Sequence, residues 1–90
     1  MPDVTVTLPR LVCEATGAPH HVEVTGEDTY AVLDALFAAH PGVRTHLLDE
    51  TGALRPNVLC ALDGDRTRLE QPEAVRSGSS LTFVPSVAGG

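Results

Sequence analysis

The feature that most constrains the fold is one well-defined helical segment, set among segments that alternate like β-strands. From Tyr30 to His40, large side chains recur at intervals of three and four residues, which is the spacing of one face of an α-helix. The residues on that face are Tyr30, Leu33, Leu36, Phe37 and His40. The Glu-Asp-Thr run at 27–29 supplies N-cap candidates, and the Pro-Gly pair at 41–42 ends the helix. A single helix that covers one face of a sheet indicates a small α+β domain.

Segments on both sides of this helix have the patterns of strands. Residues 4–8 and 21–25 alternate apolar and polar side chains with period two, which predicts an antiparallel hairpin. Residues 57–62 form a short apolar run, and the Asp-Gly pair that follows is a strong signal for a two-residue hairpin turn. A short strand is expected near 67–69, and residues 81–84 alternate again as the final strand.

The order of these segments fits a ubiquitin-like β-grasp arrangement. In that fold the first and last strands lie parallel at the centre of a mixed sheet, here of four to five strands, with one main helix on one face. We expect residues 13–20 to form a loop and residues 43–54 an irregular connection with one helical turn. One domain is predicted at 1–85, followed by a flexible diglycine tail at 86–90.

The charge balance excludes some classes of partner. The chain has six basic and twelve acidic residues and a net charge of −6, and it contains no lysine. Nucleic acids and anionic membranes require clustered cations, so we expect neither as a partner and favour a basic protein surface instead. No signal peptide and no apolar run of about 20 residues are recognised, which predicts a cytoplasmic protein with reduced cysteines.

The histidines and cysteines have ordinary structural interpretations. His20 and His21 are adjacent on a strand, point to opposite faces and cannot chelate one ion together. Cys60 lies in a buried strand position and Cys13 at the edge of a loop, with no neighbouring cation in sequence to activate either thiol. No phosphate-binding glycine motif is present. We therefore expect no metal, no permanently bound cofactor and no catalytic centre within the chain.

The sequence after the last strand, PSVAGG, suggests a function. Glycine has no Cβ, so a Gly-Gly backbone can pass through a narrow channel and present its carboxylate to another protein's active site. The alternative is a frayed end that packs against nothing.

The whole chain resembles the MoaD/ThiS family of sulfur-carrier proteins, which are ubiquitin-like β-grasp domains. The ending LTFVPSVAGG matches the family at Pro85, Val87, Ala88, Gly89 and Gly90. Other similar segments are VTVTLP, the TG of ATGAP, HPGV, LDETGALRP and the Asp-Gly-Asp turn at 63–65. The TG loop and LDETGALR are closer to the cysteine-biosynthesis carriers of actinobacteria than to the small subunits of molybdopterin synthase. The chain departs from the family at Asn57–Gly64 and Gly78–Ser80, which concerns the identity of its partner more than its fold.

The resemblance implies that this chain is a carrier or substrate and not an enzyme, although it could be the small subunit of a molybdopterin-synthase-like complex. An E1-like adenylyltransferase/sulfurtransferase would use ATP to adenylate the Gly90 carboxylate and convert it to a thiocarboxylate. Val87, Ala88 and Gly89 would thread the partner's active site. A sulfur-accepting enzyme would then use the sulfur for cysteine, a molybdopterin or a secondary metabolite.

A docking surface is predicted on the open side of the sheet. If Val58, Cys60 and Leu62 face the helix, the residues between them face away from it. The predicted docking residues are Leu59, Ala61, Thr82, Val84 and Pro85. The alternative is a set of scattered surface apolar residues with no function.

Two other functions remain open at this point. The chain could be a protein modifier that is conjugated through Gly90, although without lysine it could form no lysine-linked chains on itself. It could also be a binding module whose tail is inert.

Overall fold

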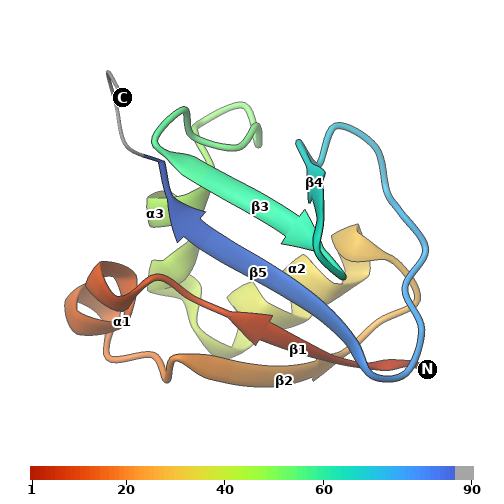
Figure 1. Cartoon of the computed structure of the whole chain (residues 1–90). Helices are drawn as coiled ribbons and strands as arrows, with labels where there is room; N and C mark the ends of the chain where they lie inside the picture. The colour runs from red at the N-terminus through yellow and green to blue at the C-terminus, as the bar shows by residue number, and fades with distance from the viewer. Residues whose placement is uncertain (87–90) are drawn as a thin grey trace.

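The structure, a computed structural model that describes residues 1–86, is a five-stranded mixed sheet with helix α2 packed across one face (Figure 1). The strands are β1 (Asp3–Thr7), β2 (His21–Thr25), β3 (Val58–Leu62), β4 (Asp65–Thr67) and β5 (Ser79–Pro85). The helical elements are α1 (Arg10–Thr16), α2 (Thr29–Ala39), the 3-10 turn η1 (Pro41–Val43) and α3 (Arg44–Leu47). The strand order is β2-β1-β5-β3-β4, and the central β1–β5 pair is parallel. The predicted β-grasp arrangement is therefore confirmed.

The core lies between the sheet and α2. Val6 pairs with Leu81 across the central strands, and Cys60 pairs with Phe83 on the other side of β5. All four side chains are at most 1% exposed. Strict alternation in the strands puts every second side chain into this core, because successive residues of a strand point to opposite faces.

Helix α2 begins where the sequence predicts. Asp28 is its N-cap, and its carboxylate accepts a hydrogen bond from the Ala31 amide at 2.8 Å. Gly26 permits the tight turn from β2, because a Cβ at this position would lie 2.8 Å from the Val32 nitrogen. Only three residues therefore separate the helix from β2, and it lies across one face of the sheet (Figure 1).

The residues of α2 that are buried differ in part from those that the helical spacing predicts. The buried residues are Thr29, Val32, Leu33 and Leu36. Tyr30 is 40% exposed, and its hydroxyl donates to the Leu69 carbonyl at 3.0 Å. Thr29 is fully buried, and its hydroxyl is satisfied there by a hydrogen bond of 3.0 Å that it accepts from the amide of Glu73, a residue distant in sequence. Spacing alone could not identify that partner.

The predicted loop at 13–20 is wrong in its first half, because α1 occupies Arg10–Thr16. Pro9 holds an extended conformation at the N-cap, where its missing N–H costs nothing. Gly17 closes the helix with φ 78° and donates its N–H to the Cys13 carbonyl at 2.8 Å. Pro9 before this segment and Gly17 after it are the sequence signals from which α1 could have been predicted.

The connection after α2 contains the expected helical turn, as η1 and α3. The loop beyond α3 is organised by Asp49, whose carboxylate accepts from the Thr51 hydroxyl at 2.6 Å, the Thr51 amide at 2.8 Å and the Ala53 amide at 3.1 Å. These bonds, the Thr51 hydroxyl first, lower the pKa of Asp49. The predicted turn at Thr51-Gly52 is confirmed by Gly52, which has φ 88°.

The β3–β4 hairpin forms at the predicted Asp63-Gly64 turn, where φ is 51° and 87°. The Asp63 carboxylate accepts from the Ser80 amide at 2.9 Å and so ties the turn to β5. The second strand of the hairpin is Asp65–Thr67 and not 67–69, because the chain turns away at Leu69 with φ 57°. The edge of β3 beyond Cys60 therefore has no strand beside it.

No helix within residues 1–86 is both long and apolar enough to span a membrane.

Replacement of Phe83, which is 1% exposed, by alanine should lower the free energy of unfolding by about 3–5 kcal/mol through lost burial and a residual cavity. The matched variant Val84→Ala, at the next position of β5 on the opposite face, should cost less than about 1 kcal/mol. Urea unfolding monitored by circular dichroism measures both values. Equal losses in the two variants would contradict the assignment of faces.

Candidate functional site

The predicted site residues fall into two groups. Val87, Ala88, Gly89 and Gly90 lie outside the described residues, so their proposed roles stay predictions. The predicted docking residues lie within the described part of the chain, on β3 and β5.

Four of the docking residues share one face of the sheet. Leu59 pairs with Val84 and Ala61 pairs with Thr82, so the four side chains form two adjacent cross-strand pairs. Their neighbours Val58, Cys60, Leu81 and Phe83 are buried on the opposite face, under α2. Val84 is 43% exposed, and the other three are half-buried. The structure thus brings Leu59, Ala61, Thr82 and Val84 together on the open face.

The residues paired with Ala61, strand by strand, form a row that crosses all five strands of the sheet. Its register runs from Arg66 on β4 through Ala61 and Thr82 to Thr7 on β1 and His21 on β2. The Thr7 hydroxyl lies 3.1 Å from the His21 Nδ1 atom, within hydrogen-bond distance. The apolar patch on β3 and β5 is therefore flanked by polar side chains on one side and by an arginine on the other.

Pro85 belongs to a different surface from the other four. It pairs with Val58 and lines a cavity of about 430 Å³ beside α1. Leu11 of α1 also lines this cavity and is 75% exposed. Sequence reasoning missed Leu11 because it did not recognise α1. The chain remains attached to the sheet just beyond β5, since the Ser86 amide donates to the Asn57 carbonyl at 2.8 Å.

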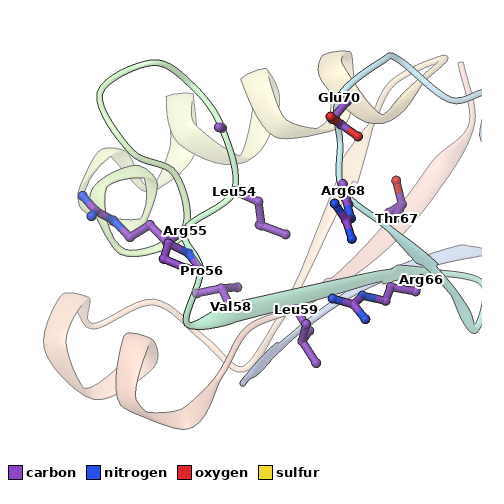
Figure 2. A pocket seen from close by; sticks show the side chains of 10 residues that line it. Leu54, Arg55, Pro56, Val58, Leu59, Arg66, Thr67, Arg68 and Glu70 are labelled. Carbon is purple, nitrogen blue, oxygen red and sulfur yellow. The ribbon is translucent and has the colours of Figure 1, made fainter. Parts of the chain in front are cut away.

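A second cavity lies at the open edge of β3, beyond the end of β4. Its volume is about 260 Å³, and Leu54, Val58 and Leu59 supply its apolar lining. Arg66 and Arg68 lie together on the β4 side of this hollow, with Leu54 across from them (Figure 2). Leu59 is common to this cavity and to the open face of the sheet.

The described residues offer little for covalent or metal chemistry. Burial, and secondarily the charge of Glu73, raise the pKa of the Cys60 thiol to about 12, so this thiol stays protonated at neutral pH. No group of three His, Cys, Asp or Glu side chains within residues 1–86 could hold a metal ion. The patch of Leu59, Ala61, Thr82 and Val84 lies next to the end of a central strand, and its role in docking stays a prediction.

Comparisons of sequence give two kinds of relative. The chain is 30% identical to the sulfur carrier protein CysO of Mycobacterium tuberculosis over 92 residues, which cover 98% of this chain and 99% of the relative. It is 33% identical to small archaeal modifier protein 1 of Haloferax volcanii over 70 residues, which cover 77% and 78% of the two chains. No model of a known protein family matches the chain.

Solved structures of CysO proteins and of small archaeal modifier protein 1 are similar in fold to this chain. Mycobacterium tuberculosis CysO superimposes with a TM-score of 0.81 at 28% identity, covering 93% of this chain and 99% of its own. The BexX/CysO complex of Amycolatopsis orientalis contains a chain with a TM-score of 0.80 at 28% identity, and coverage of 97% and 99%. Small archaeal modifier protein 1 of Haloferax volcanii gives 0.79 at 26% identity, with coverage of 98% and 99%.

Iodoacetamide at mildly alkaline pH should label half-buried Cys13 in the folded protein and leave Cys60 unmodified until the chain is unfolded. The folded state holds the Cys60 proton up to a pKa of about 12, whereas the ordinary value is 9.0. Deprotonation therefore favours the unfolded state, and the free energy of unfolding should fall as the pH rises above about 9.

In the variant Cys60→Ala, the part of this fall in the free energy of unfolding that comes from the Cys60 thiol should be absent. Mass spectrometry of peptides locates the label, and urea titrations at several pH values measure the free energy. Rapid labelling of Cys60 in the folded protein would contradict its burial.

Proposed function

The chain belongs to the MoaD/ThiS family of ubiquitin-like β-grasp proteins, and from that premise we propose that it is a sulfur carrier activated at Gly90. Its relatives are named as carriers and modifiers, so the role is that of a sulfur carrier or ubiquitin-like protein and not of a catalyst. The observation that carries the proposal is the likeness to the CysO carrier over 98% of the chain. The Gly89-Gly90 pair beyond β5 supports the choice of Gly90.

The proposed activation begins at the Gly90 carboxylate. A carboxylate is a poor electrophile, so one of its oxygens first attacks the α-phosphorus of ATP and pyrophosphate leaves. A sulfur nucleophile then attacks the carbonyl carbon of the acyl adenylate, and AMP leaves with the oxygen. If the sulfur comes from a persulfide, a thiol must cleave the S–S bond to release the thiocarboxylate. The partner enzyme binds the ATP and supplies the sulfur.

The body of the chain would position the tail for these steps. β5 is paired with β1 from Ser79 to Thr82 and with β3 from Leu81 to Pro85, so the point where the tail begins is held by β3. Val87, Ala88 and Gly89 would pass through the partner's channel, where the missing Cβ of glycine allows close approach of the backbone. The body then stays outside while the carboxylate reaches the reacting atoms.

Two partners are proposed to use the open face of the sheet. The first is an E1-like adenylyltransferase and the second is a sulfur-accepting enzyme, and both would contact Leu59, Ala61, Thr82 and Val84. The CysO of Amycolatopsis orientalis forms a complex with BexX, which supports a stable partner contact in a relative. Cysteine biosynthesis is the favoured destination of the sulfur, with molybdopterin or a secondary metabolite as alternatives. The proposed reaction takes place in the cytoplasm.

A second candidate function is protein modification. The match at 33% identity to small archaeal modifier protein 1 favours it. The same activated Gly90 would then be joined to lysine side chains of target proteins. Isopeptide-linked adducts, detected by peptide mass spectrometry of lysates under loading conditions, would distinguish modification from sulfur transfer.

Incubation with ATP, a sulfide source and the host's activating enzyme should replace one oxygen of Gly90 by sulfur. Intact-protein mass spectrometry, followed by fragmentation, measures and locates the change. A chain that lacks Gly90 should show no sulfur loading while it keeps the thermal stability of the full chain, because the sheet is intact. Sulfur loading of that truncated chain would refute activation at Gly90.

A charge placed on the open face should weaken docking. We expect Val84→Asp to raise the KM for the activating enzyme at least about fivefold, with kcat little changed, because an unpaired carboxylate would face the partner. Ala38→Asp, at an exposed position of α2 behind the sheet, is the matched control and should leave KM unchanged. Equal effects of both variants would place docking elsewhere.

A further inference from the structure

The cavity at the edge of β3 concentrates positive charge in an acidic chain. Arg55, Arg66 and Arg68 all line it, so half of the six basic residues of the chain lie at one place. Glu70 is the one acidic residue in its lining. Arg66, Arg68 and Glu70, without the Arg55 guanidinium, which is directed away from the hollow, make a local charge of +1, against a net charge of −6 for the chain. The local charge is therefore opposite in sign to the overall charge.

Two of these arginines are free to bind a ligand. The Arg55 Nε donates to the Thr45 carbonyl at 2.6 Å, and Figure 2 shows its guanidinium turned away from the hollow. Arg66 and Arg68 are exposed, and their side chains make no hydrogen bond or ion pair with any residue in 1–86. A guanidinium carries five N–H donors in a planar fork that matches a carboxylate.

The fold keeps this cavity open. β4 pairs with β3 only from Cys60 to Leu62 and ends at Thr67. The positive φ of Leu69, together with the bond of 3.1 Å from its amide to the Thr67 hydroxyl, directs the chain away from β3. The half-buried side chain of Leu59 therefore has no strand beside it on this side and lies next to two unpaired cations.

We propose that this cavity binds an acidic segment of a partner protein, with a carboxylate on Arg66 and Arg68 and an apolar side chain against Leu54 and Leu59. The two arginines select an acidic side chain by charge complementarity, and the apolar lining selects an apolar side chain next to it in the partner segment. The site is continuous with the open face, because Leu59 belongs to both and Arg66 pairs with Ala61. The partner surface that faces this edge is acidic, although the net charge of the chain alone favours a basic one.

A protein carboxylate fits the cavity better than a polyanion does. Glu70 in the lining would repel the several phosphate charges of a nucleotide or nucleic acid more strongly than the single charge of a carboxylate. A side-chain carboxylate against these guanidinium groups would form charge-assisted hydrogen bonds, which are stronger than neutral ones. Because both arginines are exposed, each contact adds a modest amount and is screened by salt.

The test uses the full chain alone and two capped synthetic peptides of equal length, one of alternating leucine and glutamate and one of alternating leucine and lysine. NMR titration follows the backbone amides and the arginine Nε–H groups. The acidic peptide should shift the resonances of Leu59, Arg66 and Arg68. Arg66→Gln and Arg68→Gln should each weaken its binding about threefold, and the double variant about tenfold.

The matched control is the double variant Arg44→Gln/Arg76→Gln, which removes the same charge from two other cavities. It should bind the acidic peptide within about twofold of the original chain, because long-range effects of exposed charges are screened. Added salt should weaken binding to the original chain more than to the Arg66/Arg68 double variant.

Three outcomes would overturn the proposal. They are equal binding of the lysine peptide, unchanged affinity in the Arg66/Arg68 double variant, and inorganic phosphate shifting the same resonances at lower concentration than the acidic peptide. The last outcome would indicate a small-anion site instead. Because the titration needs neither ATP nor an activating enzyme, its failure and a failure of sulfur loading at Gly90 are distinguishable.

Discussion

The parallel pairing of β1 with β5 is the constraint on which the rest of the structure depends. It joins the start of the described chain to its last strand, and Val6 and Leu81, both 0% exposed, lie opposite each other within it. Parallel neighbours need a crossover connection, and everything between β2 and β5 belongs to that crossover. A slip by one residue would move Leu81 and Phe83 to the open face, so burial on one side specifies the register strongly.

That register also determines the candidate site. With Phe83 and Cys60 directed into the core, Val84 and Leu59 must point outward as direct partners. The same strand therefore supplies residues of the core and of the proposed docking face, and its end is the point where the proposed tail begins. Under the proposed function, the pairing of β5 with β1 and β3 would both stabilise the sheet and fix the place from which the tail is presented.

The distribution of charge changes the interpretation of the composition. A net charge of −6 describes the average field that a distant partner meets. At contact, the unpaired guanidinium groups of Arg66 and Arg68 dominate one edge of β3, because solvent and salt screen charges farther away. An interface can therefore be acidic on the partner's side even when the whole chain is acidic.

Local interactions made part of this structure predictable from the sequence. The alternation of β1 and β5, the Asp28 cap of α2 and the positive φ values at Asp63-Gly64 depend on neighbouring residues, and sequence patterns record such effects directly. The proposed role of Gly90 likewise came from residue types and family resemblance. Only the tertiary structure decided which residues meet across long separations. The burial of Thr29 depends on Glu73, and the grouping of Leu54 with Arg66 and Arg68 depends on where β4 ends. Contacts between distant segments leave no periodic trace in the sequence, so these features required the folded chain.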